Sequence, residues 1–218
     1  MDEHLLRFKK DKTLLFIDCE TFNLCLNSVG NLPWQIGMIK TKSGFNTKSM
    51  KKWDLHIRWN TDLEIGAEAA RITKYNPAKF EKLAISPEEA FVDIERELDS
   101  CDYIVGHNIL GFDIYLLKDY YNYMGKDYKH LMPKIIDTNS IAKGIKMDVA
   151  YQANGDPNGL LLHQYKMVHK RKRGVKTNLT FLGKEFDIEH DYENLHDAVV
   201  DLELNIKVWD KLKYMVDI

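Results

Sequence analysis

The stretch that most constrains the fold is "LLFIDCET", Leu14–Thr21, an apolar run that ends in two acidic residues. A short apolar run of this kind is typical of a buried β-strand. Because side chains alternate between the two faces of a strand, Asp18 and Glu20 project from the same face and their charges repel. Two carboxylates so placed favour a bound cation. A single D-x-E is more often a solvated strand end, so the assignment needs further acids elsewhere in the chain.

The segments that follow predict an antiparallel meander. Residues Trp34–Lys40 form an apolar run that predicts a second strand. In Lys51–Trp59 aromatic and aliphatic residues alternate with polar ones, as expected for a half-buried third strand. The three strands come one after another without a helical segment between them, which favours antiparallel neighbours.

The second half of the chain alternates helices and strands. Pro87–Ser100 is predicted to be a helix with Ser86 as its N-cap. A strand at "DYIVGHN", a helix that ends at Gly125 and a fifth strand at "KIIDT" follow. Alternation of this kind implies parallel strands with helices on both faces. We therefore expect an α/β protein with a mixed five-stranded sheet.

The C-terminal third is less regular. Residues 141–177 contain Asn-Gly and Asp-Pro turn signals and are predicted to be a partly helical, basic insertion. Helices are expected over 178–188 and, as the last element, over 194–215. No linker or repeat divides the chain, so we expect a single domain over residues 1–218.

Composition limits the location and the partners. The net charge of −2 and the pI near 6.4 give no overall attraction for polyanions, so such attraction needs a local basic patch. The run from His169 to Lys176 supplies one. Three cysteines without metal-type spacing indicate reduced thiols in a cytoplasmic protein. No run is long and apolar enough to span a membrane, so no membrane association is expected.

Two further acids complete a candidate site. Asp113 is expected about one turn into the helix that follows a buried strand, where α/β sheets present functional groups. Asp201 lies in the last helix between Val200 and Leu202, on its inward part. His196 would stand about 140° away from Asp201 around a continuous helix. We therefore expect His196 in the preceding loop or in the first turn, above the site.

These motifs resemble those of a known family. D-x-E-T at Asp18–Thr21, "HN" followed by "FD" between His107 and Asp113, and H-x-x-x-x-D from His196 to Asp201 occur in the family's order. The chain resembles the DEDDh-type 3′–5′ exonucleases, which include the proofreading subunit of bacterial replicative DNA polymerase, ribonuclease T and oligoribonuclease. The resemblance covers nearly the whole chain and implies an RNase H-like fold.

The resemblance also implies roles for the site residues. Asp18, Glu20 and Asp201 would bind one divalent ion, Asp18 would also bind a second, and Asp113 would support the site directly or through water. His196 would act as the general base, since its pKa lies near the operating pH. Oxygen ligands favour Mg²⁺ or Mn²⁺ over a structural zinc. Two ions about 3.5 to 4 Å apart are a known device for in-line phosphoryl transfer.

Two departures from the family pattern concern substrate contacts. One residue more lies between His107 and Asp113 than in the proofreading subunit, a spacing similar to that of family B polymerase proofreading domains, which carry Tyr in place of the final His. The usual glycine after D-x-E-T is also absent. Candidate substrate-binding residues are those beside the acids and those of the basic run: Thr21, Phe22, His107, Asn108, Lys170, Arg171, Lys172 and Arg173.

For most of these residues a structural role is an open alternative. An aromatic residue just after a strand is more often part of the core, and His107 and Asn108 could simply hydrogen-bond the strand end. The basic run is either a solvated loop or a phosphate-binding segment. Asp197, four residues before Asp201, would share its helix face and could be a surrogate ligand, but the resemblance assigns that position no role.

The expected activity is release of nucleoside 5′-monophosphates from the 3′ end of a nucleic acid, with single-stranded DNA ahead of RNA. A polymerase or another replication protein is a candidate partner. Two alternatives remain open at this stage: an exoribonuclease that trims RNA, and a non-catalytic nuclease-like module that binds nucleic acid or a polymerase.

Overall fold

The computed structural model describes residues 3–23, 31–44, 50–61, 63–153, 156, 158–195 and 197–218. Its sheet consists of β1 (Thr13–Thr21), β2 (Pro33–Lys42), β3 (Lys51–His56), β4 (Tyr103–Gly106) and β5 (Ile135–Asp137). The order is β3-β2-β1-β4-β5. β3, β2 and β1 are antiparallel neighbours, whereas β4 and β5 run parallel to β1. The predicted mixed five-stranded sheet and its antiparallel meander are therefore confirmed.

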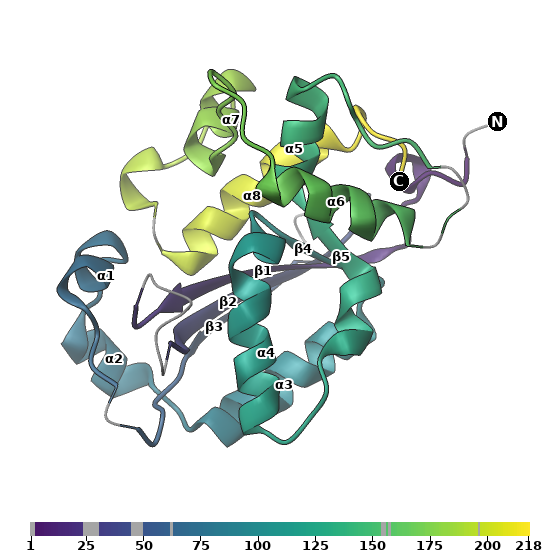
Figure 1. Cartoon of the computed structure of the whole chain (residues 1–218). Coiled ribbons are helices and arrows are strands. Elements are labelled where there is room, and N and C mark those ends of the chain that lie inside the picture. The colour runs from purple at the N-terminus through teal and green to yellow at the C-terminus, as the bar shows by residue number, and fades with distance from the viewer. Residues whose placement is uncertain are drawn as a thin grey trace.

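The helices cover both faces of this sheet, as predicted. They are α1 (Ala67–Ile72), α2 (Pro77–Leu83), α3 (Pro87–Ser100), α4 (Asp113–Tyr123), α5 (Thr138–Lys146), α6 (Gly159–His169), α7 (Leu179–Glu185) and α8 (Ala198–Leu212). Figure 1 shows α5, α7 and α8 above the sheet and α3 and α4 below it. No helix in the described ranges is long and apolar enough to cross a membrane.

Alternate residues of β1 pack into two separate hydrophobic cores, one on each face of the sheet. Leu15, Ile17 and Cys19 pack with the apolar side chains of α3 and α4. Leu14 and Phe16 pack with those of α5, α7 and α8. Because the side-chain period of a strand is two, Asp18 and Glu20 continue the second set and project toward α8. This alternation fixes the face on which the acidic site forms.

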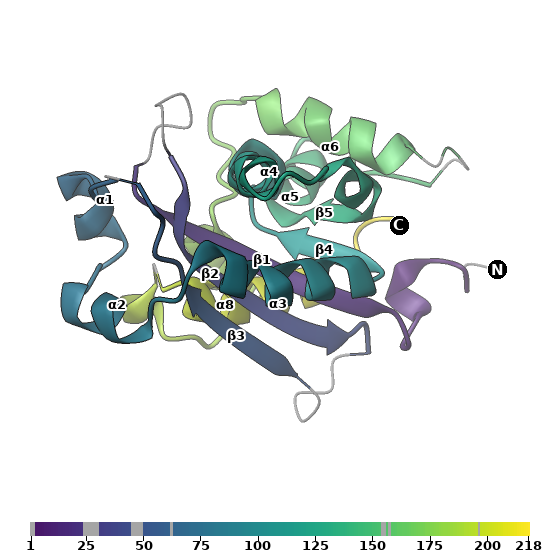
Figure 2. The same ribbon diagram turned by 90° about the horizontal axis from the view of Figure 1, so that it is seen from below.

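Helix α6 closes one edge of the sheet. Figure 2 shows the strands in order from β3 to β5, with α6 beyond β5. The side chain of Gln164, which is fully buried, donates from Nε2 to the carbonyl oxygen of Ile135 and accepts through Oε1 from the backbone N–H of Asp137. The side-chain amide thus pairs with β5 much as a neighbouring strand would.

Helix α3 begins where it was predicted, whereas β3 is shorter than expected. The Ser86 hydroxyl accepts a hydrogen bond from Glu89 N at 3.1 Å and so caps α3. β3 ends at His56 rather than Trp59, because Ile57 and Arg58 leave the ladder to bond with Trp34 and Ile85.

A second difference places Asp113 at the first residue of α4 and not a turn inside it. Asn108 adopts a left-handed backbone with φ 66°, and Ile109–Gly111 form a 3₁₀ turn. Phe112, with φ −143°, then separates that turn from α4.

The division into one domain with an insertion at 141–177 stays a prediction. Residues 141–177 contain the end of α5, all of α6 and the exposed basic run.

Candidate active site

The site forms where β1 ends and α8 begins. In the β1–β2 ladder Asp18 stands opposite Gly37, and Glu20 stands opposite Gln35. A Cβ atom at Gly37 would lie 2.9 Å from Cβ of Ala198, so only glycine lets the start of α8 approach the sheet this closely. The close approach brings the first turn of α8 over the two acids of β1.

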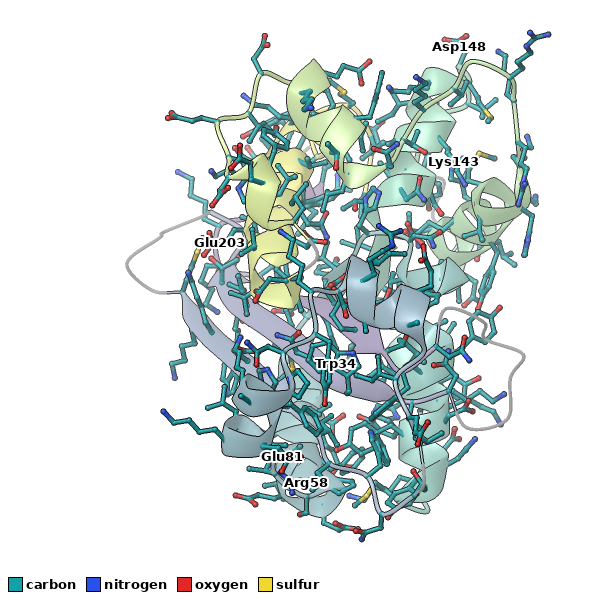
Figure 3. The ribbon with its side chains drawn as sticks, turned by 90° about the vertical axis from the view of Figure 1, so that its left-hand side faces the viewer. Trp34, Arg58, Glu81, Lys143, Asp148 and Glu203 are labelled. Carbon is teal, nitrogen blue, oxygen red and sulfur yellow. The ribbon has the colours of Figure 1, made fainter. Side chains whose placement is uncertain are left out.

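Asp201 completes a group of three carboxylates. It lies in the first turn of α8. One carboxylate oxygen from each of Asp18, Glu20 and Asp201 lies within 4.8 Å of the other two. Figure 3 views this end of the molecule, with α8 in yellow beside the purple strands, the labelled Glu203 on the α8 side and Trp34 on the other.

Asp113 reaches the site from the other face. Its side chain is buried, and its Oδ1 accepts a hydrogen bond from the backbone N–H of Cys19 at 3.0 Å. Asp113 is therefore tied to the residue between the two acids of β1. It is not part of the three-carboxylate group, although its charge contributes to raising the pKa of Asp18.

Burial and mutual repulsion destabilise the charged forms of these acids. Burial, followed by the nearby carboxylates, raises the pKa of Asp18 and of Glu20 well above the ordinary range. Burial also raises the pKa of Asp113 to about 7. Neither Asp18 nor Glu20 has an ion-pair partner among the described residues. A divalent cation would relieve this repulsion, and oxygen-only ligands fit hard ions such as Mg²⁺ or Mn²⁺.

Asp197 caps α8 and is not part of the three-carboxylate group, although its charge contributes to raising the pKa of Glu20. Its Oδ1 accepts from the backbone N–H groups of Val199 and Val200. Its Oδ2 lies 3.9 Å from the ammonium of Lys79, which is also 3.6 Å from Asp54. An N-cap aspartate needs extended backbone, so it stands outside the regular helix.

The structure places the other candidate residues without testing their substrate contacts. Thr21 is buried and donates to the carbonyl oxygen of Asn23, and Phe22 is buried in the α3–α4 core. His107 Nδ1 lies 3.0 Å from the Thr138 hydroxyl, and burial lowers the pKa of His107 to about 4. These contacts are structural, and the predicted contacts with substrate stay predictions.

The basic run is exposed, and the residue just after it is hydrogen-bonded toward the turn before Asp113. Lys170, Arg171, Lys172 and Arg173 follow α6 and are all exposed. At its end, the hydroxyl of Thr177 donates to Asn139 Oδ1 at 2.6 Å, and Asn139 in turn donates to Asn108 Oδ1 at 3.3 Å. The run therefore joins the turn that leads to Asp113. His196 lies outside the described residues.

Sequence reasoning missed the fully buried acid Asp137. Its side chain is fully buried at the end of β5 and accepts three backbone hydrogen bonds. Within "KIIDT" an acid could have been suspected as the N-cap of the next helix, and Asp137 does cap α5. Its other partners lie far away in sequence, and no local pattern indicates them.

The fold and the site together define a class of protein. A mixed α/β sheet that presents clustered carboxylates at the end of its first strand is suited to metal-dependent phosphoryl-transfer chemistry. The chain belongs to the exonuclease family RNase_T, whose sequence pattern it matches over residues 15–209. The expected resemblance to the DEDDh-type 3′–5′ exonucleases and the RNase H-like fold are thereby confirmed.

Solved structures share the fold at low sequence identity. An exonuclease I structure discussed in terms of processivity is 19% identical, with a TM-score of 0.71, and covers 94% of this chain. E. coli exonuclease I with a dT13 oligonucleotide is 20% identical, with a TM-score of 0.70 and 93% coverage. A zinc-bound form of the E. coli exonuclease I–ssDNA complex is also 20% identical, with a TM-score of 0.71 and 94% coverage.

In all three cases the chain spans 41% of the exonuclease I chain. The similarity therefore concerns one part of that enzyme and carries the fold alone. A search of curated protein sequences gave no significant match.

Proposed function

We propose that the chain is a metal-dependent 3′–5′ exonuclease that shortens single-stranded DNA and releases nucleoside 5′-monophosphates. The observation that carries the proposal is the approach of Asp18, Glu20 and Asp201 to within 4.8 Å in a chain of the exonuclease family. The repulsion between these like charges lowers the stability of the folded protein, and a bound cation would offset that repulsion.

The residues present fit a pair of Mg²⁺ or Mn²⁺ ions. Asp18, Glu20 and Asp201 would hold one ion, and Asp18 would contribute to a second. Asp113, fixed on Cys19 N, would support this arrangement directly or through water. When bound, the ions would supply stabilisation for the charge that develops on the attacking and leaving oxygens.

The chain's own side chains would handle the proton. In the proposed step a water oxygen forms a bond to the last phosphorus atom while the bond from phosphorus to the 3′ oxygen breaks. His196, assigned through the family resemblance, would take the proton of the water, and the departing 3′ oxygen regains a proton. The phosphate then leaves on the terminal nucleoside as a 5′-monophosphate.

Single-stranded DNA is the proposed substrate for two reasons. E. coli exonuclease I, which shares the fold, has been solved with dT13 and dA16 oligonucleotides. The exposed cations of residues 170–173 offer this chain its own contact with a polyanion. RNA remains the second candidate, because no described residue is assigned to a 2′-hydroxyl.

The test is a degradation assay with 5′-labelled strands of single-stranded DNA, duplex DNA and RNA of one sequence. We expect a ladder that shortens from the 3′ end with Mg²⁺ or Mn²⁺ and no product with EDTA. A phosphorothioate at the last 3′ linkage should slow the reaction. Binding of the strand without shortening, with either ion, would instead support the non-catalytic module.

The same assay examines His196. The variant His196→Ala should lower turnover by roughly 10² to 10⁴, as expected for loss of a general base, with Mn²⁺ affinity unchanged. Glu203→Gln is a matched control, since Glu203 lies on α8 and pairs with Lys52 away from the acids. An unchanged rate and pH profile in His196→Ala would contradict the base assignment.

A cytoplasmic location is part of the proposal. Cys19 and Cys101 are buried free thiols, as suits a reducing compartment. A polymerase or replication partner rests on the family resemblance alone.

A further inference from the structure

Asp137 is a buried carboxylate to which the proposed reaction assigns no part. It is fully buried at the last position of β5. Its Oδ1 accepts from the backbone N–H groups of Asn108 at 3.2 Å and Ser140 at 3.0 Å, and its Oδ2 accepts from Leu110 N at 3.1 Å. One carboxylate thus satisfies donors from two separate segments.

The first of these segments is the turn that leads to Asp113. Asn108 has φ 66°, and a Cβ atom at Gly111 would lie 2.6 Å from Asn108 Oδ1, so the turn is tight. A left-handed residue is conformationally unfavourable, and the first N–H groups of a 3₁₀ turn have no acceptor within the turn. Such a turn therefore needs acceptors from elsewhere in the protein. Asp137 supplies the acceptors for two of these groups. The turn then delivers Asp113 to the backbone N–H of Cys19.

Thr138, the residue after Asp137, connects the end of β5 to α8. The hydroxyl of Thr138 donates to Oδ1 of Asn205 at 2.8 Å, and both residues are buried. Asn205 lies one helical turn after Asp201. The end of β5 therefore holds both the turn before Asp113 and the helix that carries Asp201.

We propose that Asp137 is a positioning residue that fixes Asp113 relative to the carboxylates of Asp18, Glu20 and Asp201. It does so through the Asn108–Leu110 turn, without contact with substrate. Charged acceptors form stronger bonds with backbone N–H groups than neutral ones do. An asparagine at this position would present an NH₂ group to donors and could accept on one side only. The inference rests on the proposed exonuclease activity.

The experiment compares the wild type with Asp137→Asn, Thr138→Val and a matched control, Asp102→Asn. Asp102 also accepts a backbone bond, from Thr13 N at 2.7 Å, but it is exposed and lies just before β4, at the opposite end of that strand from Asn108. The kcat and KM for a single-stranded oligonucleotide are measured with Mn²⁺, well below the melting temperature of each variant. Mn²⁺ affinity is measured by calorimetry on the same proteins.

We expect Asp137→Asn to lower kcat by about 10- to 100-fold, as for a small misplacement of a reacting group. KM should change less than twofold, Mn²⁺ should bind more weakly, and Thr138→Val should show a smaller effect of the same kind. Asp102→Asn should keep the wild-type values. A lower melting temperature with wild-type kcat and Mn²⁺ affinity would overturn the inference, because Asp137 would then only stabilise the fold.

Two outcomes separate this inference from the proposed function. If Asp137→Asn does not fold, Asp137→Ser decides, because serine can still cap α5 but lacks the second oxygen that accepts from Leu110 N. Wild-type kcat in that variant overturns the inference. If the wild type shortens no strand, the proposed function fails, and Mn²⁺ affinity decides alone: weaker binding in Asp137→Asn supports positioning, whereas equal binding overturns it.

Discussion

Each acidic side chain of the site has its own structural support. Asp18 and Glu20 are placed by strand alternation, Asp201 by the close packing of α8 on Gly37, and Asp113 by a bond to Cys19 N. None of these supports is the carboxylate of another acid of the site, so removing one carboxylate leaves the others in place. The acids can therefore be tested one at a time without loss of the fold.

The first prediction concerns the three clustered carboxylates. Asp18→Asn or Asp201→Asn should abolish degradation, because each removes a proposed ion ligand. The metal-free melting temperature should stay the same or rise, since one repelling charge is gone. The assay is turnover with Mg²⁺ together with thermal unfolding in EDTA, with Glu203→Gln as the control. Near wild-type turnover in either variant would contradict the metal assignment.

The second prediction concerns the pH dependence of stability. The pKa of Asp113 is about 7 in the folded protein, above its ordinary value near 3.9. Between these values the folded state holds a proton that the unfolded state has lost, so this group makes the metal-free protein less stable as pH rises from about 4 to about 7. Asp113→Asn should lack this contribution.

Denaturant unfolding in EDTA across that range measures the difference between the two proteins. His107, whose pKa is lowered to about 4, acts with the opposite sign, because its contribution is lost as pH falls from about 6.5 to about 4. Both proteins keep His107, so it cancels in the comparison. Parallel stability curves for wild type and Asp113→Asn would contradict the raised pKa of Asp113.

At the scale of elements, local sequence patterns were sufficient to predict the regular helices and strands. The alternation in β1 and the capping of α3 by Ser86 are encoded within a few residues. The turn at 108–112 is not encoded locally: Asn108 has a left-handed conformation, and its N–H bonds to Asp137, an acceptor 29 residues away. Asp113 therefore begins α4, whereas the sequence predicted it about one turn inside the helix.

The third prediction concerns the basic segment after α6. Changing Lys170, Arg171, Lys172 and Arg173 to Gln should raise KM on long strands and flatten its salt dependence. The log–log slope should fall by about 0.7 for each phosphate that the variant no longer neutralises. Dinucleotides should be degraded at the wild-type rate, because they end before reaching the segment.

Binding as a function of salt measures the effect of these substitutions. A variant without the exposed charges of Lys82 and Lys211 serves as the control, since these lie on α2 and α8. Equal affinity and equal salt slope on a long strand would mean that residues 170–173 form a solvated loop.

For the whole molecule, ion binding should raise the free energy of unfolding. A ligand that binds only the folded state at about 100 times its Kd adds about 2.7 kcal/mol. For a chain of this size that corresponds to a rise in Tm of roughly 5 to 10 °C. We expect such a rise with Mn²⁺ in the wild type and a much smaller one in Asp201→Asn. Equal shifts would place the ion elsewhere.

The glutamine that pairs with β5 has a consequence for how copies of the molecule meet. An open sheet edge can template further strands and lead to aggregation. Gln164 occupies hydrogen-bonding groups of β5 that an incoming strand would need, and so prevents a further strand from pairing there. At the other edge, the exposed Lys51 and Lys52 of β3 would repel the same residues of a second copy. Concentrated protein should therefore resist growth into fibrils from either edge.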